Sequence, residues 1–239
     1  MINFNIAQWR AWAPGLESAD DWQAWSRQPY VPAPSDAAPD VSFLPAMQRR
    51  RLSRLARMAF SVGWPLAEGH GQLPLVFISR HGETPRTFEI LSDLAADQPL
   101  SPTQFSLSVH NAVIGLWTIL RGSTCEMTAL AANGDGLEHG MLEAAALLAE
   151  GAPAVLLIIT EEQPPEAYRR WIDDVPFPYA LGLLLTPGDE WQLSLESATD
   201  EQPPIEWPHA LDLLRTLLGQ HASCQHQWKS RVWNWQRRP

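Results

Sequence analysis

The sequence predicts an α/β fold in which a mostly parallel central sheet is flanked by helices. Short apolar runs typical of strands alternate with helical patterns, the connections are short, and the run over 154–160 is apolar throughout. Strand, helix and strand in that order require a right-handed crossover, which makes the two strands parallel. No repeat or long linker interrupts residues 1–239, so we expect a single domain with a proline-rich loop over 28–40.

The first half of the chain is expected to contain two helices and two strands. Residues 47–59 repeat apolar side chains at the helical period, which predicts an amphipathic helix. Residues 74–79 form a short β-rich run, and residues 125–131 are predicted as a second strand. Residues 108–120 are apolar on nearly all sides, which is typical of a buried helix.

The second half continues the alternation of helices and strands. Residues 137–149 are rich in strong helix formers, and Gly151 beyond them is suited to ending a helix. The strand over 154–160 follows directly. Residues 179–185 and 191–196 predict the two strands of a hairpin that turns at Pro187-Gly188-Asp189.

The C-terminal region combines a helix with a tryptophan-rich tail. Residues 208–218 predict a last amphipathic helix. In the tail, Trp228, Trp233 and Trp235 alternate with polar residues, which suits an edge strand or a contact with a partner. The same side chains are equally suited to filling the core.

The composition excludes several classes of function. Seventeen basic and twenty-seven acidic residues give a net charge of −10, so affinity for nucleic acid or anionic membranes is not expected. Two cysteines, Cys125 and Cys224, are too few for a disulfide scaffold or a cysteine-rich zinc site, and we expect no metal or cofactor. No apolar run reaches the ~18 residues of a membrane span, and the start lacks a secretory signal pattern. We therefore expect a soluble cytoplasmic protein.

One short motif suggests phosphate chemistry. Arg80-His81-Gly82-Glu83 follows an apolar strand and resembles the histidine phosphatase and phosphoglycerate mutase family. There the histidine accepts a phosphoryl group and the arginine binds the phosphate. However, about a third of this chain precedes the motif, which belongs on that family's first strand, and the later His139-Gly140 lies in a helical pattern. A phosphomonoesterase is therefore the alternative hypothesis, and the simpler interpretation is a turn with a hydrogen-bonded His81.

A longer resemblance covers more of the chain. Residues 101–119 contain Ser101-Pro102, Asn111, Gly115 and Thr118-Ile119 without a gap. This segment resembles the loop and helix that precede the nucleophile strand in β-ketoacyl synthases, and the following elements keep that family's order. Residues 13–25 resemble the start of the synthase-like proteins called chain length factors. The resemblance implies a thiolase-like half-domain.

The departures from that family imply that the chain is not an enzyme. Ketosynthases use a cysteine at a tight turn onto a helix N-terminus, where the helix dipole lowers the thiol pKa. The corresponding residues 128–136 hold no cysteine or serine, and Thr128 is their only hydroxyl group. Cys125 lies too early and Cys224 lies outside any matching motif. The second half of the fold, which supplies two histidines, is missing, so we predict no catalytic residue.

The resemblance instead implies a partner. Thiolase-type subunits pair across a two-fold axis, so this chain is expected to form a heterodimer with an active ketosynthase and to shape its acyl tunnel. The implied pathway is type II fatty acid or polyketide synthesis of the aryl polyene kind. The residues expected at the tunnel or interface are Gln104, Phe105, Ser108, Asn111 and Ala112. The alternative is that Phe105 and Val109 are ordinary core residues. A half-fold alone would also expose a large apolar face.

Five arginines crowd residues 49–57, and Arg50, Arg54 and Arg57 are predicted to share one helix face. Such a face suits an acidic partner, and acyl carrier proteins are acidic. The alternative is an ordinary solvated face. A plain scaffold that only holds a carrier protein is a third hypothesis. His110, within the predicted buried helix, is expected to be a hydrogen-bonded structural histidine rather than a metal ligand.

Overall fold

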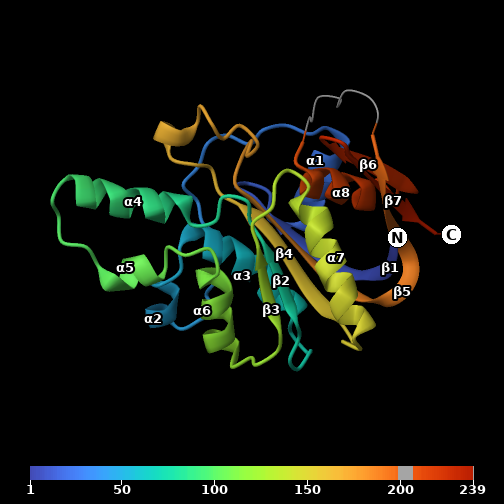
Figure 1. The fold of residues 1–239 in the computed structure, drawn as a ribbon, viewed down its shortest axis with the longest axis horizontal. Coiled ribbons are helices and arrows are strands. Elements are labelled where there is room, and N and C mark those ends of the chain that lie inside the picture. Colours follow the sequence, from blue (N-terminus) through green and yellow to red (C-terminus); the bar gives the residue numbers. More distant parts are fainter. Residues whose placement is uncertain (199–206, 239) are drawn as a thin grey trace.

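The computed structural model describes residues 1–198 and 207–238, and these form one mixed sheet with helices on both faces (Figure 1). Six strands follow one another in the order β3-β2-β4-β5-β7-β6, and β1 pairs separately with β5. The strands are β1 (Ile2–Trp12), β2 (Leu75–Ile78), β3 (Met127–Leu130), β4 (Val155–Glu161), β5 (Tyr179–Ser197), β6 (Ser223–Trp228) and β7 (Arg231–Arg237). The predicted α/β fold, with a central sheet flanked by helices, is confirmed.

The parallel part of the sheet is smaller than predicted. Only β3, β2 and β4 run in parallel, and the chain crosses from β3 to β4 through α7 (Gly136–Ala149). The pairings of β5 with β4, β1 and β7, and of β6 with β7, are antiparallel. The reason is the connection after β4: it contains only the short turn η1 (Glu166–Tyr168), and a parallel return requires a full crossover.

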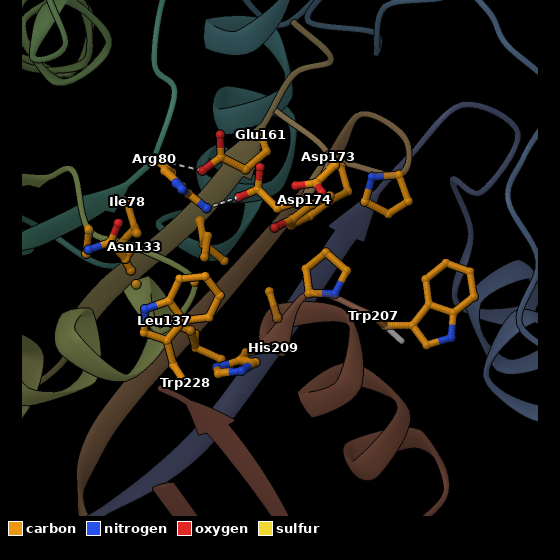
Figure 2. A pocket seen from close by; sticks show the side chains of 18 residues that line it. Ile78, Arg80, Asn133, Leu137, Glu161, Asp173, Asp174, Trp207, His209 and Trp228 are labelled. Atoms are coloured by element: carbon orange, nitrogen blue, oxygen red, sulfur yellow. Dashed lines mark hydrogen bonds and ion pairs between the residues drawn. The ribbon is translucent and has the colours of Figure 1, made fainter. Parts of the chain in front are cut away.

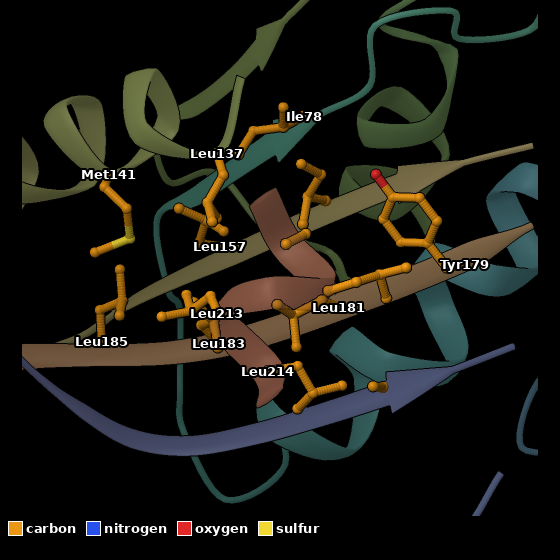
Figure 3. Close-up of a cluster of buried hydrophobic side chains, with 14 of the residues drawn as sticks. Ile78, Leu137, Met141, Leu157, Tyr179, Leu181, Leu183, Leu185, Leu213 and Leu214 are labelled. Atoms are coloured by element: carbon orange, nitrogen blue, oxygen red, sulfur yellow. The ribbon is translucent and has the colours of Figure 1, made fainter. Parts of the chain in front are cut away.

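Alternating side chains of the buried strands divide the core into two layers. Leu181, Leu183 and Leu185 of β5 pack with α7, with α1 (Ala19–Arg27) and with α8 (His209–Leu218), as Figure 3 shows for α7 and α8. Ala180 and Leu184 point to the opposite face, where α3 (Arg54–Leu66) and α6 (Ala112–Arg121) cover the sheet. The continuous apolar strand predicted over 154–160 is β4, which is buried along its whole length between these layers.

The predicted helix over 47–59 is wrong in its bounds. The chain forms a short α2 (Ala46–Arg49), leaves the helix, and begins α3 at Arg54. Ser53 causes the break, because its hydroxyl accepts a hydrogen bond from the backbone N–H of Ala56 at 3.0 Å and so caps a new helix. The helix predicted over 108–120 is α6, which begins four residues later than predicted, and a separate short helix, α5 (Pro102–Ser106), precedes it.

The predicted hairpin at Pro187-Gly188-Asp189 is also wrong. β5 runs through this segment, and the turn residues form an irregularity where the pairing with β1 shifts between Phe4 and Asn5. The Asn5 side chain accepts a hydrogen bond from the backbone N–H of Glu190 at 3.0 Å. A Cβ atom on Gly188 would lie 2.2 Å from that side chain, so the position requires glycine. β1 holds both sides of the segment together, and the sequence analysis did not anticipate β1.

The tryptophan-rich tail folds back as the hairpin β6–β7, with β6 at the edge of the sheet. Trp233 and Trp235 are buried in the core, so the hypothesis that they dock a partner is wrong; Trp228 is half-buried. The predictions for β2, β3, α7, β4 and α8 are confirmed to within about two residues. α4 (Thr84–Ala95) was not anticipated. Within the described ranges, no helix has the length and hydropathy needed to cross a membrane.

Candidate functional site

Three helices on one side of the molecule expose an apolar surface. α4 and α5 extend away from the sheet beside α6 (Figure 1), and neither α4 nor α5 contains a buried residue. Exposed apolar side chains recur along this segment, and we call them the apolar surface: Leu91, Leu94, Leu100, Phe105, Val109 and Ile119. Large apolar side chains left exposed on successive helices favour an interaction site on this side of the molecule.

The five residues predicted at the tunnel or interface lie along α5 and the start of α6. Gln104 and Phe105 are exposed on α5, and Ser108 donates a hydrogen bond from its hydroxyl to the Phe105 carbonyl at 2.9 Å. Asn111 is exposed at the N-cap position of α6, and Ala112 is buried as the first residue of that helix.

The alternative that Phe105 and Val109 belong to the core is wrong, because their exposed fractions are 66% and 45%. Ser101 explains why α5 forms: its hydroxyl accepts a hydrogen bond from the backbone N–H of Gln104, and Pro102 occupies the first helical position. The Ser-Pro pair therefore starts a short helix that carries Gln104 and Phe105 outward.

The turn between β3 and α7 corresponds to the predicted position of a nucleophile. Residues 131–136 hold no cysteine, serine or threonine. Thr128 lies in β3 instead, and its hydroxyl donates a hydrogen bond to Glu143 at 2.7 Å. The indole of Trp228 covers the turn, and a Cβ atom on Gly134 would lie 2.3 Å from this ring. The hairpin β6–β7 thus occupies the space that a side chain at residue 134 would need.

Neither cysteine can serve this turn. Cys125 precedes β3, at the opposite end of that strand from residues 131–136. Cys224 lies on β6, where burial raises the pKa of its thiol to about 11. The Cys224 thiol therefore keeps its proton at neutral pH and is a poor nucleophile.

A cavity of about 570 Å³ opens beside this turn (Figure 2). The ends of β2 and β4 and the starts of α7 and α8 surround it, and Trp228 and His209 form part of its wall. Its polar lining is mainly acidic, with Glu161, Asp173 and Asp174 facing Arg80. Such a lining repels phosphate more than it attracts it.

The candidate phosphatase residues are bound to one carboxylate. Arg80 Nη1 lies 2.6 Å from Asp174 Oδ2, and His81 Nε2 lies 2.9 Å from Asp174 Oδ1. His139 lies on α7 and pairs with Asp135 at 3.4 Å. The simpler interpretation, a turn with a hydrogen-bonded His81, is confirmed. His110 is likewise hydrogen-bonded, with Nε2 2.7 Å from the Ser79 carbonyl oxygen.

Glu161 connects the end of β4 to the turn after β2 through hydrogen bonds. Its buried carboxylate accepts hydrogen bonds from the backbone N–H groups of Arg80 and His81 and, at 3.1 Å, from the hydroxyl of Ser79. Burial in this site raises the pKa of Glu161 to about 7, although the hydrogen bonds and the nearby His81 act in the opposite direction.

One cluster of side chains has the composition of a metal site. Glu138, His209 and His226 are buried together, and one ligand atom from each lies within 4.8 Å of the other two. The sequence analysis missed this cluster because its members are 71 and 88 residues apart. A buried glutamate at the start of α7 was the only local signal.

The predicted arginine face does not form. Arg50 lies exposed between α2 and α3, whereas Arg54 begins α3. Arg54 donates hydrogen bonds to the carbonyl oxygens of Ser35 and Ala37 at 2.7 and 2.9 Å, which holds the proline-rich loop. Arg57 donates a hydrogen bond to the Arg49 carbonyl at 2.9 Å. Because the helix is interrupted at Ser53, Arg54 and Arg57 form hydrogen bonds with backbone carbonyl groups of this chain and do not share a face with Arg50.

The fold is that of a thiolase-like α/β protein, and the turn before α7 holds no cysteine, serine or threonine. The sequence profile of the β-ketoacyl synthase N-terminal domain matches residues 22–236, and the chain belongs to this family. No protein of curated function matches the chain significantly.

Solved structures show the same fold. A chain of the complex between a ketosynthase (ApeO) and its chain length factor (ApeC) from Xenorhabdus doucetiae is 31% identical, with a TM-score of 0.88 over 99% of this chain and 100% of that one. The ishigamide ketosynthase/chain length factor is 14% identical, with a TM-score of 0.63 over 84% and 68% of the two chains. A β-ketoacyl synthase from Burkholderia phymatum is 12% identical, with a TM-score of 0.61 over 82% and 65%.

The contact between Gly134 and Trp228 can be tested by a double-mutant cycle. We expect Gly134→Ala to lower the free energy of unfolding by about 1–3 kcal/mol, because the added methyl group overlaps the half-buried ring of Trp228. In a Trp228→Ala background the same substitution should cost much less. Urea denaturation of the four proteins measures the coupling, and an equal cost in both backgrounds would contradict the described packing.

Glu161 should make stability depend on pH. Its folded pKa of about 7 exceeds its ordinary value of 4.5, so the folded state binds the extra proton between these values. Stability should therefore fall as the pH rises from 4.5 to about 7, by about 3 kcal/mol from this group. Glu162, whose pKa is also raised to about 7, contributes in the same direction.

The variant Glu161→Gln isolates the contribution of Glu161. Denaturation of both proteins between pH 4.5 and 8 should show a shallower fall for the variant, because the contribution of Glu161 is then removed while that of Glu162 remains. Parallel curves for the two proteins would show that Glu161 ionises normally.

Proposed function

We propose that this protein is a non-catalytic chain length factor that pairs with an active ketosynthase and shapes its acyl tunnel. The observation that carries the proposal is the 31% identity, over nearly the full length of both chains, to a chain of a ketosynthase–chain length factor complex. This chain covers only 68% and 65% of two other synthase-like chains of the same fold. The Xenorhabdus chain, by contrast, is covered over 100% of its length, which supports its being the same kind of subunit as this one.

The residues at the turn before α7 support a role without covalent catalysis. A ketosynthase needs an ionisable thiol at this turn, and residues 131–136 offer no thiol or hydroxyl group. Trp228 fills the adjacent space. The buried thiol of Cys224, with its raised pKa, is no substitute. Any condensation must then take place on the partner subunit.

The apolar surface supports the presence of a partner. Leu94, Phe105 and Ile119 are each more than half exposed, although each is a large apolar side chain. Burial of such side chains is worth about 1.5–3 kcal/mol each, so a partner that covers this surface gains substantial binding energy. The ketosynthase is the partner that the family suggests.

Along α5 and the start of α6 we propose that Gln104, Phe105, Ser108 and Ala112 limit the depth of the partner's acyl tunnel, with Asn111 at the interface. Phe105 is the strongest candidate, because its ring projects from a short helix and contacts little of its own chain. Bulk at the end of a tunnel stops a growing chain by overpacking. The aryl polyene type of product belongs to the same proposal.

A contact with an acyl carrier protein is also proposed, with a revised set of residues. Arg50 and Arg51 are exposed and free to meet an acidic surface. Arg54 and Arg57 contribute mainly by holding the loop and α2 in place. Their replacement would therefore affect the carrier contact indirectly.

The heterodimer tests the proposal directly. After co-expression with the ketosynthase of the neighbouring reading frame, Ile119→Asp should weaken the complex at least about tenfold, because a charge is then buried at the interface. The matched control is Leu195→Asp, an exposed leucine on β5 away from α4–α6 (Figure 1). Co-purification and titration measure both, and equal weakening by the two variants would contradict the proposed interface.

Product length tests the role of Phe105. With the intact pair and a carrier protein, Phe105→Ala should lengthen the product by at least one extension cycle, whereas Phe105→Trp should shorten it, because the tunnel end moves with side-chain volume. Leu94→Ala on α4 is the control and should leave product length unchanged. Mass spectrometry of the released chains distinguishes these results, and a product of constant length would favour a plain scaffold.

A further inference from the structure

Glu138, His209 and His226 meet in the interior from three separate elements, α7, α8 and β6. Their exposed fractions are only 0%, 4% and 4%. Glu138 Oε2 lies 3.0 Å from Nδ1 of His209, and Glu138 Oε1 lies 2.7 Å from Nδ1 of His226. The two imidazole rings are stacked with their centroids 4.3 Å apart. Each carboxylate oxygen thus faces one imidazole nitrogen, and all three donors converge.

From this geometry we propose that the three side chains bind one divalent transition metal ion of the zinc class. Two imidazole nitrogens and one carboxylate oxygen are a donor set that suits Zn²⁺, which prefers nitrogen and oxygen ligands in tetrahedral arrangement. Zinc–ligand distances of about 2.0–2.2 Å separate neighbouring donor atoms by about 3.4 Å. The present separations of 3.0 and 2.7 Å are therefore shorter by less than about 1 Å.

The charges around the cluster favour a cation. Asp135 and Asp212 lie near it, but Arg231 binds Asp135 at 2.6 Å and Arg215 binds Asp212 at 3.2 Å. Glu138 has no arginine or lysine among its ion pairs in the described chain. An uncompensated buried carboxylate costs several kcal/mol, so this one requires positive charge from protonated imidazole or from a metal.

The hydrogen bonding around the cluster also supports a metal site. Trp235 Nε1 donates a hydrogen bond to Glu138 Oε1 at 3.2 Å, which orients the carboxylate as outer-shell groups do in metal sites. His226 and His209 both turn Nδ1 toward this carboxylate, so an ion at the cluster would be held by Nδ1 of each imidazole.

The ion would join the C-terminal region to α7. His209 also lines the 570 Å³ cavity, so the site has a route to solvent. His226 lies two residues before Trp228, the side chain that covers the turn before α7. A metal ion bound by Glu138, His209 and His226 would therefore hold the hairpin β6–β7 over the turn before α7. The proposal does not depend on the proposed function.

The test uses the full chain, freed of metal by chelator treatment, with Co²⁺ and Zn²⁺ as probes. We expect one equivalent of Co²⁺ to produce the visible absorption of a tetrahedral site with imidazole and oxygen ligands. Zn²⁺ should displace it and raise the melting temperature by at least about 3 °C. Absence of stoichiometric binding by the wild-type chain would show that the cluster is a metal-free hydrogen-bonded triad, and would overturn the proposal.

Variants locate the binding. His226→Ala should abolish the Co²⁺ spectrum, whereas His139→Ala, a half-exposed histidine on α7 next to Glu138, should leave it unchanged. If His226→Ala does not fold, His226→Cys provides the decisive measurement, because a coordinating thiolate adds a sulfur-to-cobalt charge-transfer band that a structural role cannot produce. No such band in folded His226→Cys, or loss of binding in His139→Ala, would overturn the assignment.

Discussion

The unbroken strand β5 is the constraint from which the rest of the structure follows. Its first part pairs with β4 and its last part pairs with β7, while β1 runs beside both. One strand therefore connects the parallel part of the sheet to the C-terminal hairpin. Because the hairpin β6–β7 is paired to the last part of β5, Trp228 reaches the turn before α7 and His226 reaches Glu138.

The two faces of the protein have different roles as a result. At the end of the sheet near α7, the chain surrounds a cavity, and charged side chains there form ion pairs within the chain, as Arg80 does with Asp174. On the side of α4–α6, it leaves large apolar side chains in water. Association with a partner would cover these side chains and add to the stability of the folded chain. This division agrees with the proposed role as the accessory half of a pair.

The sequence predicted the elements with strong local patterns. The apolar β4 and the helix-forming α7 were found within about two residues, because their side chains alone determine them. The predictions from the sequence were wrong where other contacts override the local preference. β1 pairs with β5 on both sides of Pro187-Gly188-Asp189, which makes this segment a bulge instead of a turn. The cap at Ser53 begins a new helix within a segment that was predicted as one helix. α5 itself was not predicted, because the resemblance implied a loop there; only the placement of Gln104 and Phe105 on an outer segment came from the resemblance.

The contact between Gly134 and Trp228 has a consequence for substitution at both positions. A side chain at residue 134 meets the indole ring, so it requires a second change at residue 228, 94 residues further along the chain. Removal of the tryptophan alone would leave a hole beside the turn. The two positions are therefore constrained as a pair, although they lie far apart in the sequence.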